Sequence, residues 1–224
     1  TNEISDQTFS WIEEILKDTK EQDIHVLAVS HQNLLAHNPY FTEGFLIHRA
    51  QELEAFYEKY DVLANLSGHI HIQHIEDSGL PEILTSALPV SPHHYGMLEF
   101  DGKTLDYQAK ILDVGAWAGE QGLTDQNLLD FSQASWVFME QVAARKLEPD
   151  LLDSQLTAVE KELLLQTFAQ LNADYFAGRQ IDPANHQQGL SLMQETGLSF
   201  YPTYIDSILK SAKKGHESFQ LELE

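Results

Sequence analysis

The sequence predicts an α/β domain followed by an all-α helical bundle, and three observations support this prediction. Between residues 1 and 112, short apolar runs of β character alternate with amphipathic stretches. Asp101-Gly102 separates two strand-like segments, which is a strong hairpin signal. From residue 124 onward, apolar side chains recur at helical spacing only. We therefore assign residues 1–112 to the α/β domain, 113–123 to a linker and 124–224 to a helical C-terminal domain.

The elements of the first domain follow from local pattern. Residues 8–20 carry an apolar face typical of a helix, and the run at 25–30 indicates a short buried strand. Asn38-Pro39 places a loop over 32–43, after which residues 45–59 read as a second helix. The remaining strands are predicted at 62–67, 70–75, 82–86, 95–100 and 104–111.

The second half begins with three glycines and few large apolar side chains, a composition that favours a linker. Thr124 is suited to cap a helix that extends to about Arg145. Beyond that point we predict helices only. Their signals are a capping box at Thr157 and Glu160, a helix end at Gly178, an N-cap at Asp182-Pro183 and a last helix over 202–214.

The charge balance excludes several classes of partner. Thirteen Lys and Arg stand against 35 Asp and Glu, which gives a net charge of −22. So acidic a surface repels nucleic-acid polymers and anionic lipid surfaces. There is no cysteine, and no apolar run approaches the roughly 20 residues of a membrane span. We expect a soluble chain without thiolate chemistry, and the sequence leaves its compartment and oligomeric state open.

Histidines mark the candidate site. Nine of the eleven lie within residues 1–112, and Gly68-His69-Ile70-His71 directly follows a predicted strand. In extended chain, side chains two residues apart share a face, so His69 and His71 would aim at one spot, roughly 7 Å apart along the backbone. Two imidazoles on one face suit one metal ion or two adjacent ions. The alternative is an edge strand that carries two solvated histidines.

A third histidine strengthens the metal interpretation. His31 directly follows the apolar run 26–30, at the strand end where ligands bind in α/β sheets. The 38-residue step from His31 to His69 leaves room for a loop, a helix and a second, parallel strand. Both strands would then deliver histidine to one edge of the sheet. We predict a metal site at His31, His69 and His71.

Four further histidines are weaker candidates. His37 and His74 could orient the ligands, but solvated positions are the favoured expectation for both. His93 and His94 follow a predicted core strand and could line a pocket. Because neighbours in a strand point to opposite faces, at most one of that pair would face any single site.

Two stretches resemble a known family. VLAVSHQNLLAHN (26–38) and VLANLSGHIHIQHI (62–75) resemble the last two sequence blocks of the calcineurin-like metallophosphoesterases. They look most like bacterial members that resemble cyclic-nucleotide phosphodiesterases and carry a helical C-terminal domain. The resemblance implies a metallophosphoesterase β-sandwich, with His31 and His69 on one metal and His71 on a second. It also implies hydrolysis of small phosphate esters, more specifically phosphodiesters, by a metal-bridging hydroxide.

The same resemblance defines what this sequence lacks. Gln32 stands where many relatives have a second histidine, and the first three blocks of the family (Asp-x-His, Gly-Asp and Gly-Asn-His) are absent. We therefore expect the C-terminal part of a longer enzyme, which supplies part of the site and is inactive by itself. Imidazole ligands suit two Mn, Fe or Zn ions better than Ca or Mg.

Two readings from other classes stay open. One is a catalytically idle module that keeps the fold and binds protein partners through its helical domain. The other is a mononuclear structural zinc protein in which His31, His69 and His71 hold one ion.

Overall fold

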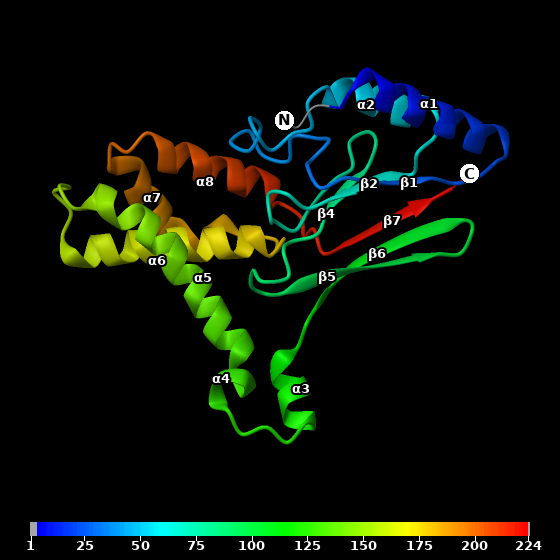
Figure 1. The fold of residues 1–224 in the computed structure, drawn as a ribbon. Coiled ribbons are helices and arrows are strands. Elements are labelled where there is room, and N and C mark those ends of the chain that lie inside the picture. Colours follow the sequence, from blue (N-terminus) through cyan, green and yellow to red (C-terminus); the bar gives the residue numbers. More distant parts are fainter. Residues whose placement is uncertain (1–3, 224) are drawn as a thin grey trace. The chain divides into compact units, whose positions relative to one another are not determined.

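The computed structural model describes residues 4–223, which divide into two compact units, Thr1–Ser86 and Ala87–Glu224 (Figure 1). The content is mixed α and β, with one small sheet in each unit.

The first unit contains a four-stranded sheet in the order β1-β2-β4-β3. Its strands are β1 (Leu27–Val29), β2 (Ala64–Ser67), β3 (His74–Glu76) and β4 (Glu82–Leu84). β1, β2 and β4 run parallel, whereas β3 is antiparallel to β4. The predicted parallel pairing of the two histidine-bearing strands is therefore confirmed, with Ala28 opposite Asn65.

Two helices, α1 (Asp6–Glu21) and α2 (Ala50–Lys59), share a core in this unit. Phe9 and Leu16 of α1 are buried in one cluster with Leu53 and Tyr57 of α2. The prediction of a buried first strand is wrong: β1 lies at the edge of the sheet, and Val29 is 77% exposed.

The predicted helix at 45–59 begins later than its apolar pattern suggests. Leu46 forms a β-bridge with Asn33, and the Ile47 N–H donates to the Asn33 carbonyl at 2.9 Å. Arg49 then adopts a left-handed conformation with φ of 67° before the helix starts. Pairing with the loop after β1 therefore displaces one turn of helix.

The second unit contains an antiparallel sheet of β5 (His94–Phe100), β6 (Thr104–Ile111) and β7 (Ser218–Glu222). The Asp101-Gly102 turn joins β5 and β6 as predicted, with Gly102 at φ of 92°. β7 pairs with β6, so the prediction of helices alone after residue 124 is wrong. Ser218–Glu222 does alternate polar and apolar residues, but the pattern is short and holds only two apolar side chains, both half-buried.

The helices of this unit are α3 (Val114–Glu120), α4 (Gln126–Leu129), α5 (Phe131–Leu147), α6 (Ala158–Phe176), α7 (Gln187–Glu195) and α8 (Phe200–Ser211), with short 3₁₀ turns at Glu148–Leu151 and Pro183–His186. α5 packs against α6, and α6 against α7 and α8. Fully buried Leu147, Leu164 and Ile208 belong to this core. The predicted capping box at Thr157 and Glu160 is present.

The segment predicted as a linker, 113–123, holds α3, which Asp113 caps by accepting a hydrogen bond from the Ala116 N–H at 2.9 Å. The compact units divide at Ser86 and Ala87, so the β5–β6 hairpin groups with the helices. Within residues 4–223, none of the helices combines the length and apolar character needed to cross a bilayer.

Candidate functional site

The ends of β1 and β2 bring two of the predicted histidines together. Parallel pairing continues past the strands, because the His31 carbonyl accepts hydrogen bonds from the Gly68 N–H at 3.3 Å and the His69 N–H at 3.0 Å. The His31 and His69 side chains therefore project from the same edge. This is the strand end at which open α/β sheets bind ligands.

The two imidazoles are in direct contact. His31 Nε2 lies 3.0 Å from His69 Nδ1, and the ring planes meet edge-to-face with centroids 4.9 Å apart. Phe45 packs on His69 at a centroid distance of 5.4 Å. One of the facing nitrogens carries a hydrogen and the other accepts it through its lone pair, so both can present lone pairs to one ion only after the donor ring changes tautomer.

This spacing fits a metal ion. Two nitrogen ligands at about 2.1 Å from one ion stand about 3.0–3.4 Å apart for octahedral or tetrahedral bond angles. The separation of 3.0 Å between His31 Nε2 and His69 Nδ1 therefore suits adjacent ligands on one ion. Among residues 4–223, however, no cluster of three or more His, Asp or Glu side chains is arranged to hold a metal.

His71 does not join that pair in the predicted manner. The His71 N–H donates to the Gly68 carbonyl at 3.1 Å, which closes a tight turn, and His71 has a φ of 64°. The expectation of an extended chain with His69 and His71 on one face is therefore wrong. Ile70 is only 6% exposed, and its burial between the two histidines accompanies the turn. The His71 side chain is exposed.

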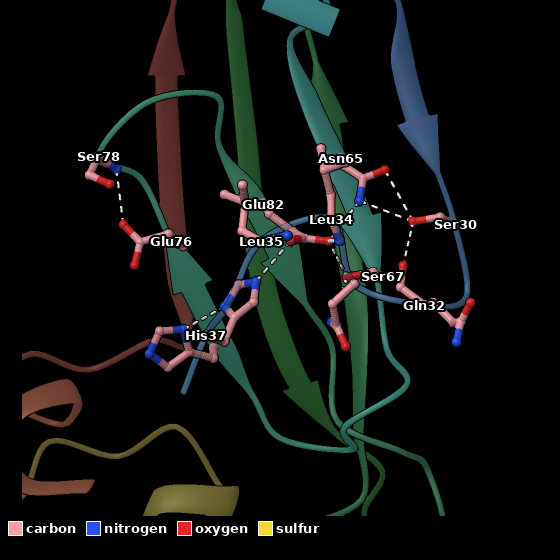
Figure 2. A network of polar contacts seen from close by, with 12 residues as sticks. Ser30, Gln32, Leu34, Leu35, His37, Asn65, Ser67, Glu76, Ser78 and Glu82 are labelled. Carbon is pink, nitrogen blue, oxygen red and sulfur yellow. Dashed lines mark hydrogen bonds and ion pairs between the residues drawn. The ribbon is translucent and has the colours of Figure 1, made fainter. Parts of the chain in front are cut away.

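A buried carboxylate lies behind this edge of the sheet. Glu82, the first residue of β4, is fully buried and accepts hydrogen bonds from two residues of the neighbouring strand β2 (Figure 2). Asn65 Nδ2 donates at 2.7 Å and Ser67 Oγ at 2.6 Å. The backbone N–H groups of Leu34, at 2.8 Å, and Leu35 donate to the same carboxylate. Glu82 thus ties the loop after β1 to the end of β2, the two segments that carry His31 and His69.

These contacts hold Glu82 in its ionised form. Burial alone would raise the pKa of Glu82, but hydrogen bonding and charge from His37, together with bonds from Leu34 and Ser67, bring that pKa below its ordinary value. A carboxylate that accepts several hydrogen bonds is stabilised in this way. The Glu82 carboxylate is therefore ionised at neutral pH.

His37 and His74 complete the network. His37 Nε2 lies 3.1 Å from the Glu82 carboxylate, and His37 Nδ1 lies 2.8 Å from His74 Nδ1. Because a carboxylate only accepts, His37 donates from Nε2, and one hydrogen is shared between the Nδ1 atoms of His37 and His74. Both histidines are buried, at 5% and 4% exposure, so the expectation of solvated positions is wrong. His37 contacts Glu82 directly, and His74 is linked to Glu82 through His37.

Asn33 adds an orphaned polar atom to this region. Its side chain is fully buried, and its Nδ2 donates to Ser67 Oγ at 3.0 Å. Its Oδ1 has no hydrogen-bond partner among the described residues. A buried acceptor without a donor is uncommon in folded proteins.

His93 and His94 belong to the second unit, whereas the strands that carry His31 and His69 belong to the first. His93 bonds to Leu88 and Ser135 within that unit. Burial, together with the positive charge of Arg179, lowers the pKa of His94 to about 4. His94 is therefore neutral at pH 7.

Sequence reasoning missed Glu82, although a signal was present. Glu82 is the only charged residue between positions 81 and 90, in an otherwise uncharged and largely apolar stretch. A charged side chain at the start of a core strand is costly to bury unless other groups pair with it or donate hydrogen bonds to it. Here those partners come from residues 34–67, which a local pattern cannot identify.

Comparison with known proteins gives a match for the helical part of the chain. Residues 113–215 match the family model described as the C-terminal domain of cyclic nucleotide phosphodiesterase. This stretch runs from α3 to the end of α8 and covers just under half of the chain. No curated protein matches the chain significantly. The C-terminal part of this chain is therefore similar to the C-terminal domain of cyclic nucleotide phosphodiesterase.

Proposed function

We propose that the protein containing this chain hydrolyses phosphodiesters of the cyclic-nucleotide type at two divalent metal ions, with this chain supplying part of the site. The observation that carries the proposal is the convergence of His31 and His69, 3.0 Å apart, at the ends of two parallel strands. The match of residues 113–215 supports a function related to cyclic nucleotide phosphodiesterases.

In this proposal His31 and His69 hold one ion through neutral imidazoles, and the exposed His71 contributes to the second. Mn, Fe or Zn ions would supply positive charge opposite the phosphoryl oxygens and lower the pKa of water in the site. Glu82 positions both histidine-bearing loops through its bonds to Leu34, Leu35 and Ser67. Ligand orientation therefore depends on a carboxylate that does not itself reach the substrate.

Local electrostatics favour a requirement for cations. Between residues 32 and 100 only Arg49 and Lys59 are basic. Arg49 pairs with Asp6 and Glu52, each at 2.7 Å, and Lys59 pairs with Glu13 at 2.9 Å. Both basic side chains are thus committed to carboxylates. An anionic ester approaching a chain of net charge −22 would need positive charge from bound ions.

The test is hydrolysis of bis(p-nitrophenyl) phosphate by the full-length product of the gene that encodes this chain, with and without Mn²⁺. We expect Mn²⁺-dependent release of p-nitrophenol that falls at least about 100-fold in His69→Ala, because a ligand to the ion is lost. His48→Ala is the matched control, since His48 is an exposed histidine of the same unit. It should keep the wild-type rate.

Two results would overturn the proposal. If the folded full-length protein is inactive with Mn²⁺, Fe²⁺ and Zn²⁺, the idle binding module becomes the better interpretation. If one zinc ion is held tightly and its chelation unfolds the protein, the three histidines serve a structural site instead.

A further inference from the structure

A serine and a histidine of the second unit form a hydrogen-bonded pair that the proposed phosphoesterase site does not use. Ser135 lies on α5, and His93 lies just before β5. His93 Nε2 is 2.9 Å from Ser135 Oγ, and His93 Nδ1 is 2.9 Å from the Leu88 carbonyl oxygen. A carbonyl oxygen only accepts, so Nδ1 carries the hydrogen and the Nε2 of the neutral ring accepts from the Ser135 hydroxyl.

The imidazole is fixed in place. His93 is 5% exposed, its ring packs on Phe131 with centroids 4.9 Å apart, and its φ is 67°. A left-handed conformation is unfavourable for a non-glycine residue and is retained where the surroundings hold it. Both ring nitrogens are thus committed, one to an orienting acceptor and one to a hydroxyl. This is the arrangement of an activated nucleophile, with the base oriented by a third group.

The Ser135 hydroxyl has two further acceptors within reach, the Ser132 carbonyl oxygen at 3.0 Å and the Ser91 hydroxyl oxygen at 3.3 Å. A hydroxyl donates a single hydrogen, so the three acceptors compete, and Ser91 Oγ is the most distant of them. Ser132 is exposed, and water can hydrate its carbonyl, whereas His93 is buried. Leaving the buried Nε2 without a donor is the more costly choice, which favours donation from Ser135 to His93.

Ser135 lines a cavity of about 230 Å³ beside α5 and α6. Its walls are mainly apolar and include Phe138, Met139, Val142 and Phe176. The space holds roughly eight water-sized groups, which suits a short acyl chain rather than a large ligand.

Two further polar side chains line the same cavity. Lys146 makes no ion pair with any described residue, in a chain that is strongly acidic. Asn172 Oδ1 accepts from the Tyr204 hydroxyl at 3.0 Å. Burial raises the pKa of Tyr204, so its hydroxyl stays protonated and remains a donor. The Asn172 amide nitrogen is therefore the part of this side chain left to donate to a ligand oxygen.

We propose that Ser135 is a nucleophile and that this cavity takes a small carboxylic ester with an apolar acyl chain. Ser135 Oγ attacks the ester carbonyl carbon while its proton passes to His93 Nε2. Lys146 and the Asn172 amide supply positive charge and hydrogen-bond donors for the carbonyl oxygen. The ester C–O bond then breaks, and the alcohol leaves with the proton from His93. Water attacks the acyl-serine, His93 takes a proton from that water and returns it to Ser135, and the carboxylic acid is released.

The test uses the 224-residue chain, an alkyl fluorophosphonate probe and p-nitrophenyl butyrate. We expect the probe to add one phosphonyl group to Ser135, found by peptide mass spectrometry. Ser135→Ala should lose the label and hydrolyse the ester about 100-fold more slowly, because the nucleophile is gone. Ser132→Ala, a serine one turn away on the same helix, should be labelled like the wild type. EDTA should change neither result, which separates this pair from the proposed metal site.

Val142→Trp is a second variant, which tests the proposal if Ser135→Ala fails to fold. It fills the cavity from a partly exposed lining position while Ser135 and His93 stay unchanged, and it should slow labelling at least about 10-fold in a folded chain. The proposal is wrong if Ser135 of the folded wild type stays unmodified after prolonged exposure to the probe. It is equally wrong if Ser135→Ala retains the wild-type rate of ester hydrolysis. In either case the pair only anchors the segment before β5 to α5.

Discussion

Glu82 connects three segments of the first unit through one side chain. Its carboxylate accepts from Leu34 and Leu35 in the loop after β1 and from Asn65 and Ser67 on β2. Removing this buried acceptor takes a hydrogen bond from each of these donors, and a buried donor left without a partner costs free energy. The fully buried carboxylate is thus the residue on which the geometry of the His31–His69 edge most depends.

Glu82→Gln should lower the free energy of unfolding at pH 7 by about 3 kcal/mol, because an amide nitrogen replaces one of the accepting oxygens. Glu76→Gln is the matched control. Glu76 pairs with Glu82 in the β3–β4 register, but it is half-exposed, and within residues 4–223 its carboxylate accepts a hydrogen bond from the Ser78 N–H at 3.2 Å. Urea unfolding should show a cost below about 1 kcal/mol for this control. Equal losses in the two variants would disprove a special role for Glu82.

The same comparison has a defined pH dependence. The pKa of Glu82 lies below its ordinary value of 4.5 in the folded protein, so the unfolded chain takes up the proton first as the pH falls. The stabilisation by Glu82 is therefore complete above about pH 4.5 and is lost as the pH falls through the lowered pKa. The difference in stability between wild type and Glu82→Gln should narrow below pH 4.5. A difference that stays constant down to the acid transition would contradict the assignment.

Helices α6 and α7 approach one another through a glycine. A Cβ at Gly189 of α7 would stand 1.9 Å from Oγ1 and 2.6 Å from Cβ of Thr167, a buried residue of α6. Gly189→Ala should therefore destabilise the chain by about 1–3 kcal/mol through overpacking. Gly119→Ala on α3 meets no atom within 4 Å and should stabilise by about 0.5–1 kcal/mol through helix propensity. Thermal unfolding of the two variants should show shifts of opposite sign, and a neutral Gly189→Ala would rule out this close contact.

How well each element could be predicted depends on where its determinants lie. The capping box at Thr157 and the hairpin at Asp101-Gly102 are local signals, and the structure contains both. The late start of α2 and the pairing of β7 depend on partners far along the chain, namely Asn33 and β6. Thr124 illustrates the same limit at shorter range, because Asp125 caps α4 instead, accepting from the Asn127 N–H at 2.9 Å.

At the scale of the molecule, histidine placement indicated the edge at which His31 and His69 meet, since two strand ends and a parallel register suffice to bring them together. The turn at His71 and the network around Glu82 could not be predicted from the sequence in this way. Both result from tertiary contacts that bury Ile70 and the carboxylate. The dinuclear centre stays a prediction.

The net charge of −22 affects the whole molecule and sets its response to salt. Like-charge repulsion opposes the compact state, and it weakens as the screening length falls from about 30 Å at 0.01 M to about 8 Å at 0.15 M salt. Salt also weakens exposed ion pairs such as Lys20–Asp61, at 2.8 Å, but each contributes only about 0–1 kcal/mol. Repulsion among the excess carboxylates therefore dominates, and NaCl should raise the free energy of unfolding at pH 7.

The measurement is urea unfolding at 10 and 150 mM NaCl, repeated near the isoelectric point of about 4.6, where the net charge vanishes. We expect a rise with salt at pH 7 and little change near pH 4.6, because only a charged chain has repulsion to screen. A similar rise at both pH values would indicate a general effect of salt on apolar burial instead. A fall at pH 7 would mean that the ion pairs outweigh the excess negative charge.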